Sequence, residues 1–452
     1  MLHADVLIAE IGSTTTLMNA FTLGDDPRYL GQGMAPTTVL EGDVRVGLSR
    51  ALADLETRLG DRLSYDRMLA TSSAAGGLRM SVHGLVYDMT VRAAEAAALG
   101  GGGVIRQVTG GRMSRYDLMD LKALHPNLIL IAGGTDYGER ETALHNSEQI
   151  AALVMRDVPV LYAGNVQNQN IVRAIFDEAG IPVFLTENVY PRLDELNIEP
   201  CRKMIQKVFE QHIVRAPGME GIRDMVTGPI LPTPGAVMEA ARLLYDEIGD
   251  LMVLDIGGAT TDVHSVSEGS PEIAALATRP EPFSKRTVEG DLGLYVNARH
   301  LVDAIGPEEL DRELSIDTEA VMAAYAPIPA TEAQRKLTER LCLEAGQTAI
   351  RRHAGRYRYI YLPEGRKTLT EGKDLSQVKY VVGTGGALTR LPHRRELLRH
   401  MADMNAAGAM LYPKPGEAAL LFDNDYIMAS LGVLSRAYPK EALALMKRSM
   451  GL

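Results

Sequence analysis

The chain has 452 residues, which at roughly 150 residues per domain suggests two or three domains. Its 47 Lys and Arg residues against 58 Asp and Glu residues give a formal net charge of -11, which argues against general binding to nucleic acid or anionic lipid. The two cysteines, Cys201 and Cys342, form no CxxC pair, so no disulfide framework, zinc ribbon or iron–sulfur site is indicated. Without secretory signal features or an apolar run of membrane-spanning length, we expect a cytoplasmic protein with no membrane association.

The N-terminal region reads as an α/β unit. Residues 4–23 predict a strand, a glycine turn at Gly12 and a second strand rich in β-branched threonine. Apolar residues recur at steps of three and four between Gly42 and Gly60, which predicts an amphipathic helix. A strand over 67–77, a helix over 91–101 and a buried strand over 127–138 follow. We therefore expect a first lobe over residues 1–150.

The next two segments differ in character. Two apolar runs flank a helix from about Gln167 to Ala179, which predicts an inserted β-α-β subdomain over residues 151–225. Prolines 229, 232 and 234 precede a helical pattern and favour a linker into a second lobe over residues 226–452.

The second lobe begins as the first does. "LDIGGATTDVHSV", from Leu254, repeats the order of strand, acidic residue, glycine turn and polar strand found around Glu10. The runs 128–138 and 378–392 close the two halves at comparable places. Glycine turns let backbone amides approach phosphate oxygens, and a neighbouring carboxylate suits a metal. Two related lobes would thus clamp a nucleotide between them.

These motifs resemble known families. "AEIGSTTTLM", "LDIGGATTDV" and "VVGTGGALTRLP" resemble the two phosphate motifs and the adenosine motif of the actin/Hsp70/sugar-kinase superfamily. "TSSAAGGLRM", "IAGGTDYGERE", "YAGNVQNQ" and "RTVEGDLG" are similar to the accessory-protein family of glutamate (methylaspartate) mutase, often labelled MutL. The resemblance implies two ribonuclease-H-like, actin/Hsp70-type lobes with mixed sheets flanking a nucleotide cleft. It also implies ATP and Mg²⁺ as cofactors, and a factor that reactivates adenosylcobalamin-dependent mutase subunits.

The resemblance assigns roles to particular positions. Asp255 and Glu10 would hold Mg²⁺ from the two lobes, because this hard cation prefers carboxylate and water oxygens. Asp262 would position the attacking water. The residues expected at the phosphates are Gly12, Ser13, Thr14, Thr15, Gly257, Gly258, Ala259 and Thr260, and those expected at the adenosine are Gly383, Gly385, Gly386 and Ala387.

Alternatives stay open. The superfamily usually has Asp where this chain has Glu10, so a binder with slow or no turnover, or a nucleotide-free binding module, competes with an ATPase. A small-molecule kinase would use the same cleft. Asp136, Glu289 and Asp291 either line the cleft or serve as turn and cap residues. Whether the chain forms a homo-oligomer is not written in these residues.

Two weaker patterns favour ordinary structural roles. "DVHSVS" resembles the DxHxxG motif of cobalamin carriers until Ser267 replaces the glycine, so His264 is expected on a surface or strand rather than at cobalt. The interleaved Arg and Tyr residues over 351–363 fit a solvated strand better than an RNA-binding surface in an acidic chain.

Overall fold

The computed structural model describes residues 2–73, 78–101, 103–193, 195–215, 218–222, 224–228, 230–278, 281–362, 365–404 and 409–452. Residues 74–77, which belong to the motif "TSSAAGGLRM", lie outside the described part. The chain divides into two compact units. The first comprises Met1–Gly76, Ile213–Thr287 and Leu292–Leu452, and the second Gly77–His212 and Val288–Asp291.

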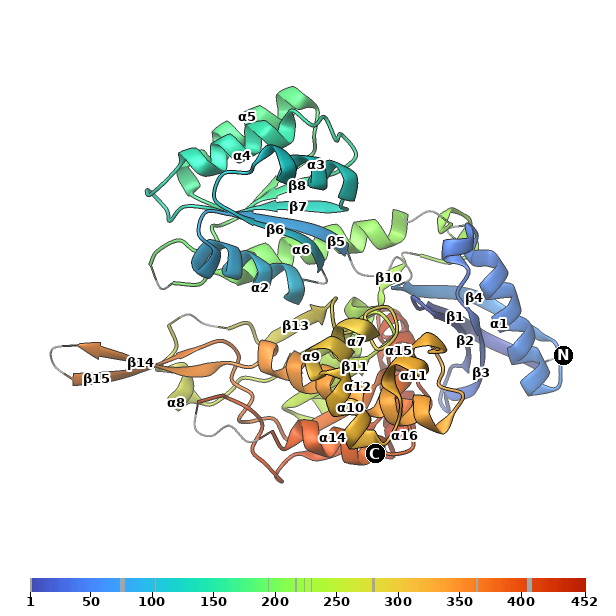
Figure 1. Cartoon of the computed structure of the whole chain (residues 1–452). Helices are drawn as coiled ribbons and strands as arrows, with labels where there is room; N and C mark the ends of the chain where they lie inside the picture. Colours follow the sequence, from blue (N-terminus) through green and yellow to red (C-terminus); the bar gives the residue numbers. More distant parts are fainter. Residues whose placement is uncertain are drawn as a thin grey trace. The chain divides into compact units, whose positions relative to one another are not determined.

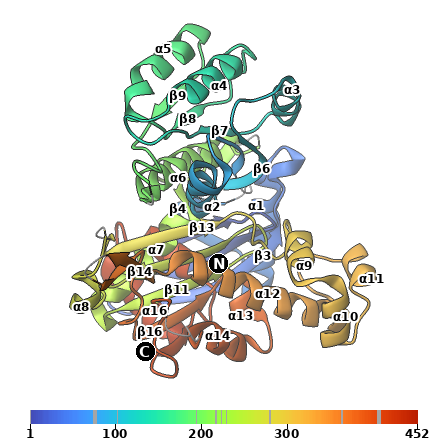
Figure 2. The same ribbon diagram turned by 60° about the vertical axis from the view of Figure 1, so that its left-hand side comes forward.

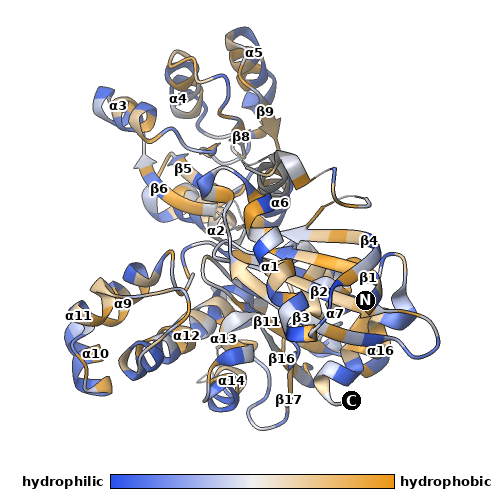
Figure 3. Cartoon of the chain, turned by 90° about the vertical axis from the view of Figure 1, so that its right-hand side faces the viewer, coloured by the Kyte–Doolittle hydropathy of each residue, from blue (hydrophilic) through white to orange (hydrophobic). Residues whose placement is uncertain are grey.

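The first unit begins with a mixed five-stranded sheet in the order β10-β4-β1-β2-β3. β1, β2 and β3 pair antiparallel, whereas β1, β4 and β10 run parallel. The strands are β1 (Leu2–Ile11), β2 (Thr15–Thr22), β3 (Arg28–Pro36), β4 (Leu63–Ser72) and β10 (Leu231–Pro232). The predicted amphipathic helix is confirmed as α1 (Val44–Leu59), whose buried Leu48 and Leu55 pack in a core with Leu7 of β1. Figure 3 shows β1 mostly in hydrophobic colours.

A second five-stranded sheet has the order β13-β12-β11-β16-β17. This is the order of the first sheet when the first sheet is read from β3 to β10. β11 pairs antiparallel with β12 and parallel with β16, and β16 pairs parallel with β17. The strands are β11 (Leu251–Ile256), β12 (Thr261–Val266), β13 (Ser284–Glu289), β16 (Tyr380–Thr384) and β17 (Ala419–Phe422). Because β11 and β12 correspond to β1 and β2 in this order, the topology confirms the internal repeat and the mixed sheets expected from the sequence.

Helices surround both sheets. A shared core joins residues of the two sheets through α7 (Thr233–Ile248), α15 (Met428–Leu434) and α16 (Pro439–Met450). α15 packs closely on α7, since a Cβ on Gly432 would stand 1.8 Å from the carbonyl oxygen of Ala236. Figure 2 shows α9, α10 and α11 grouped at one side of α12. The remaining helices of this unit are α8 (Pro271–Ala274), α9 (Ala298–Ile305), α10 (Pro307–Leu314), α11 (Thr318–Ala323), α12 (Glu332–His353), α13 (Gly385–Arg390) and α14 (Arg394–Ala402).

The second unit is a wholly parallel sheet in the order β6-β5-β7-β8-β9. This is the 2-1-3-4-5 strand order of flavodoxin-like doubly wound folds. Helices α4 and α5 cover one face and α2 and α6 the other (Figure 1). Its elements are β5 (Leu78–Gly84), α2 (Arg92–Gly100), β6 (Gly103–Gly110), α3 (Arg115–Leu124), β7 (Leu128–Ile131), α4 (Glu141–Ala151), β8 (Val160–Tyr162), α5 (Gln169–Ala179), β9 (Val183–Leu185) and α6 (Ile198–Arg215).

This unit has different boundaries from those predicted. The expected β-α-β piece exists as β8, α5 and β9, but it completes a sheet that starts at Leu78 rather than at residue 151. β7, expected to close the first lobe, pairs with β5 and β8 instead, and β4 takes the place beside β1. The sequence Leu-Ile-Leu-Ile of β7 is apolar on both faces, as central parallel strands are, and this pattern does not specify which of the sheets the strand joins.

The Arg- and Tyr-rich segment forms β14 (Arg356–Leu362), which pairs antiparallel with β15 (Gly365–Glu371). Figure 1 shows this hairpin extending away from the rest of its unit. Tyr361 is exposed, and the guanidinium of Arg366 stacks 4.7 Å from the ring centre of Tyr359. The expectation of a strand with a solvated face is therefore confirmed. None of the described helices has the length and apolar character needed to cross a membrane.

Candidate functional site

The two glycine turns predicted to meet phosphate have matching geometry. The backbone N–H of Gly12 donates to the carbonyl oxygen of Thr15 at 2.9 Å, and that of Gly257 donates to the carbonyl oxygen of Thr260 at 3.0 Å. The turns also adjoin, because a Cβ placed on Gly258 would lie 3.1 Å from Oγ1 of Thr14. The structure thus brings together residues 12–15 and 257–260 from two different sheets.

Hydrogen bonds with neighbouring loops fix the position of the first turn. The Thr37 hydroxyl donates to the Gly12 carbonyl at 2.8 Å, and the Thr37 N–H donates to the Thr14 carbonyl at 3.0 Å. The Ser13 hydroxyl donates to the carbonyl of Ser73 at 2.8 Å, so this proton is engaged within the protein rather than offered outward.

The second turn is held in a similar way. The N–H groups of Tyr295 and Val296 both donate to the Gly258 carbonyl, at 2.9 and 2.8 Å. The side-chain amide of Asn297 donates to the Ala259 carbonyl at 3.2 Å. Both turns are therefore fixed in position by loops outside their own hairpins, as a preorganised binding site requires.

Two acidic residues occupy equivalent places before these turns. Glu10 on β1 and Asp255 on β11 each stand two residues before the turn glycine. Asp255 is half-buried, and burial together with the charge of Asp423 raises its pKa to about 7. Two carboxyl groups from the two lobes thus share one electrostatic environment.

Glu10 is the more deeply buried of the two. Its side chain is 5 % exposed, and its Oε2 has no hydrogen-bond partner among the described residues. Burial, followed by the charges of Asp255 and Asp423, holds its pKa well above the usual range, and a hydrogen bond with Ser430 acts in the opposite direction. Because an unsatisfied buried carboxylate oxygen is costly, this atom is suited to a cation or a water molecule.

Asp423 is a third acidic residue that the sequence analysis missed. It follows β17 and accepts hydrogen bonds from the hydroxyls of Thr384 (2.9 Å) and Ser449 (3.0 Å). It also accepts from the N–H groups of Ile427 (3.1 Å) and Met428 (2.8 Å). Burial nevertheless raises its pKa. An apolar run ending in Asp, Leu420-Leu421-Phe422-Asp423, repeats the pattern before Asp255 and was the available signal.

Asp262, the candidate for positioning water, lies on β12 directly opposite Asp255. Residues paired in this way across antiparallel strands have their Cβ atoms about 4.5–5.5 Å apart on one face of the sheet. Asp262 is buried, so its side chain lies beside Asp255 in a largely protein environment.

The adenosine motif spans the end of β16 and the start of α13, and it contacts Asp255. Gly385 has a φ of 82°, and a Cβ there would lie 2.5 Å from Oδ1 of Asp255. Gly386 has open space where a side chain would be. Gly383 lies against Leu388 and Leu398, and the buried Ala387 packs in the core beneath α13. The motif therefore reaches Asp255 through Gly385, whereas Gly383 and the Ala387 side chain have packing roles.

The secondary candidates are assigned to the second unit. Asp136 belongs to the second unit, where its Oδ1 accepts hydrogen bonds from the Val166 N–H (2.9 Å) and the Asn188 side chain (3.0 Å), a turn-organising role. Glu289 and Asp291 also belong to that unit. His264 is fully buried within β12 rather than at the surface.

The residues present fit Mg²⁺ with water between some carboxylates and the ion. Glu10 supplies an unsatisfied oxygen, and Asp255 lies beside it. Among the described residues, however, the oxygens of Glu10, Asp255 and Asp423 are not gathered within 4.8 Å of one another. Mg²⁺ usually keeps several waters and takes only one or two protein carboxylates, so this spacing is compatible with it.

The sheets of the two lobes share one strand order, and their glycine turns lie next to each other. These two features define a protein of the actin/Hsp70/sugar-kinase fold. The chain belongs to the MutL protein family, whose family model matches residues 6–450. It is 38% identical over 458 residues to "Protein MutL" of Clostridium tetanomorphum, with 98% of each chain covered. These findings confirm the family resemblance of the motifs.

Two solved structures match this chain at low similarity. A nucleotide-free acetone carboxylase matches with a TM-score of 0.39 and 14% identity, over 95% of this chain and 70% of that chain. A nucleotide-free diol dehydratase-reactivating factor matches with a TM-score of 0.35 and 11% identity, over 98% of both chains. No functional conclusion rests on likenesses this weak.

Proposed function

We propose that this MutL-family protein binds Mg-ATP at the two glycine turns of its first unit and uses it to reactivate an adenosylcobalamin-dependent mutase such as glutamate mutase. The observation that carries the proposal is the adjacency of residues 12–15 and 257–260, which follow the buried Glu10 and the half-buried Asp255 respectively. The mutase as partner comes from the family to which the chain belongs.

Each part of the site has a task in this proposal. The N–H groups of Gly12 and Gly257 close the two turns by donating to Thr15 and Thr260. Neighbouring turn amides, such as that of Gly258, would bind phosphate oxygens. Glu10 and Asp255 would hold Mg²⁺, which neutralises phosphate charge when bound. Asp262, beside Asp255, would orient the attacking water.

The same arrangement supports coupling to a partner. The two turns belong to different sheets. A ligand that contacts both turns therefore restricts the relative position of the lobes more than a ligand that makes fewer of these contacts. ATP and ADP would then favour different lobe arrangements, and a partner that prefers one arrangement is coupled to the nucleotide state. A reactivating factor requires this kind of coupling.

The test is phosphate release from Mg-ATP, measured with the protein alone and with an inactivated mutase. The proposal expects release without any small-molecule acceptor, together with recovery of mutase activity that depends on Mg-ATP. ADP formation that requires an acceptor would instead identify a kinase. Absence of any nucleotide-dependent thermal shift would identify a binding module.

A further inference from the structure

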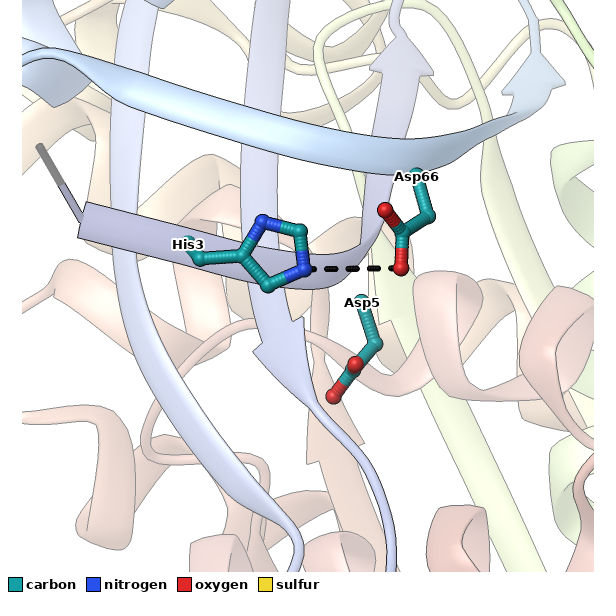
Figure 4. Close-up of side chains that lie close together, drawn as sticks. All are labelled: His3, Asp5 and Asp66. Carbon is teal, nitrogen blue, oxygen red and sulfur yellow. Dashed lines mark ion pairs between the residues drawn. The ribbon is translucent and has the colours of Figure 1, made fainter.

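A second group of metal-binding side chains lies at the opposite end of β1 from Glu10. His3 and Asp5 are on β1, and Asp66 is on β4 between Tyr65 and Arg67, whose partners on β1 are Ala4 and Val6. One ligand atom from each of His3, Asp5 and Asp66 lies within 4.8 Å of the others. Figure 4 shows the His3 ring pointing toward Asp66, with Asp5 beside them.

A hydroxyl group orients the His3 ring. The Ser64 hydroxyl lies 3.1 Å from Nδ1 of His3 and 3.2 Å from the Leu2 carbonyl. With Nδ1 next to this hydroxyl, Nε2 is the ring nitrogen that can bind a metal ion. Metal-bound histidines have this arrangement, with the other ring nitrogen donating to an oxygen.

Nε2 of His3 faces Oδ2 of Asp66 at 3.4 Å. This separation also occurs in an ordinary ion pair, that of His125 with Asp157. It is compatible with a shared metal ion, because two ligands bound about 2.0–2.1 Å from a tetrahedral Zn²⁺ lie about 3.4 Å apart.

Asp5 supplies a third ligand and the surroundings leave room for water. Its Oδ2 accepts the Leu23 N–H at 2.6 Å, which orients the carboxylate and leaves Oδ1 for a cation. A cavity of about 350 Å³ borders Asp5 and Asp66. Three protein ligands with space for a water ligand are a donor set that zinc uses.

We propose that His3, Asp5 and Asp66 bind a divalent transition metal of the zinc type, joining the start of β1 to β4. This site is separate from the Glu10 and Asp255 site and does not depend on the proposed ATP function. Its donors are one imidazole nitrogen and two carboxylate oxygens, a set that suits Zn²⁺ better than Mg²⁺.

The experiment is calorimetric titration of the chelator-treated full-length protein with ZnCl₂. Wild type is expected to bind one equivalent that His3→Ala and Asp66→Asn lose or bind at least about tenfold more weakly. Ser64→Ala keeps all three ligands and should weaken the same equivalent by about tenfold, through loss of the histidine's orienting partner.

Asp157→Asn is the matched control. His125 and Asp157 form an ion pair of the same 3.4 Å length and similar exposure, without a third ligand among the described residues. This variant should bind zinc as wild type does. Absence of zinc binding by wild type, or equal binding by Asp66→Asn, would mean that the cluster is only a surface ion pair.

Discussion

Gly385 and Asp255 are in such close contact that no other residue type fits at position 385. A Cβ there would lie 2.5 Å from Oδ1 of Asp255 and 2.6 Å from the backbone nitrogen of Ile256. The left-handed φ of 82° independently favours glycine. The end of β16 and the acidic end of β11 are therefore built against each other, so the position of the Asp255 carboxyl depends on the adenosine motif.

Gly385→Ala should both destabilise the protein and displace Asp255. Backbone strain of this kind costs about 1–3 kcal/mol, which urea unfolding would detect. Gly386→Ala is the control, because nothing lies within 4 Å of its added Cβ. The control should retain the stability of the nucleotide-free protein. Equal effects of the two substitutions would mean that the contact with Asp255 is unimportant.

Glu10→Gln should separate metal binding from folding. Burial raises the pKa of Glu10 because the charged carboxylate is costly to bury, and a neutral glutamine of similar shape avoids this cost. Stability without metal should therefore be unchanged or higher. Mg²⁺ requires the ionised carboxylate, so affinity for Mg-nucleotide should fall about tenfold more than affinity measured in EDTA. An equal loss in both conditions would show that Glu10 has only a packing role.

His264 should make the protein sensitive to acid. It is fully buried, neither ring nitrogen has a hydrogen-bond partner among the described residues, and burial followed by the charge of Arg286 lowers its pKa to about 3. Between about pH 6.5 and pH 3 the unfolded chain binds a proton that the folded chain does not, so stability falls as the pH falls. His264→Leu should reduce this slope by up to about 1.4 kcal/mol per pH unit in urea unfolding.

The exposed His400 on α14 provides the comparison for this experiment. His400→Gln should leave the dependence of stability on pH as it is in wild type. A wild-type slope in His264→Leu would contradict the assignment of acid sensitivity to the buried imidazole.

The sequence predicted the repeated hairpins well because each one is local. Strand, acidic residue and glycine turn follow within a few positions of Glu10 and of Asp255, so periodicity and turn chemistry suffice. The boundary of the second unit was harder to predict from the sequence. Pairing of β5 with β6 and β7 is a long-range choice among parallel strands, and the apolar β7 is compatible with either sheet.

Asp423 illustrates what sequence patterns alone did not reveal. It approaches Glu10 and Asp255 only because β17 lies beside β16 in the folded sheet. His3, Asp5 and Asp66 likewise come together through the parallel pairing of β1 with β4, across about sixty residues of sequence. Asp423 has one sequence signal, the apolar run before it, but that run does not place it beside Glu10 and Asp255. The group of His3, Asp5 and Asp66 has no local spacing motif, so the sheet register is needed to reveal it.

The most direct test of the central claim is calorimetric titration of Mg-ATP into wild type and Asp255→Asn. The exposed Asp246→Asn on α7 serves as a charge-matched control, and circular dichroism verifies that all three proteins are folded. Wild type and the control should bind Mg-ATP alike, whereas Asp255→Asn should bind at least tenfold more weakly, a difference of about 1.4 kcal/mol. A folded Asp255→Asn with wild-type affinity, or a wild type that does not bind Mg-ATP at millimolar concentration, would contradict the assignment of this site to a nucleotide.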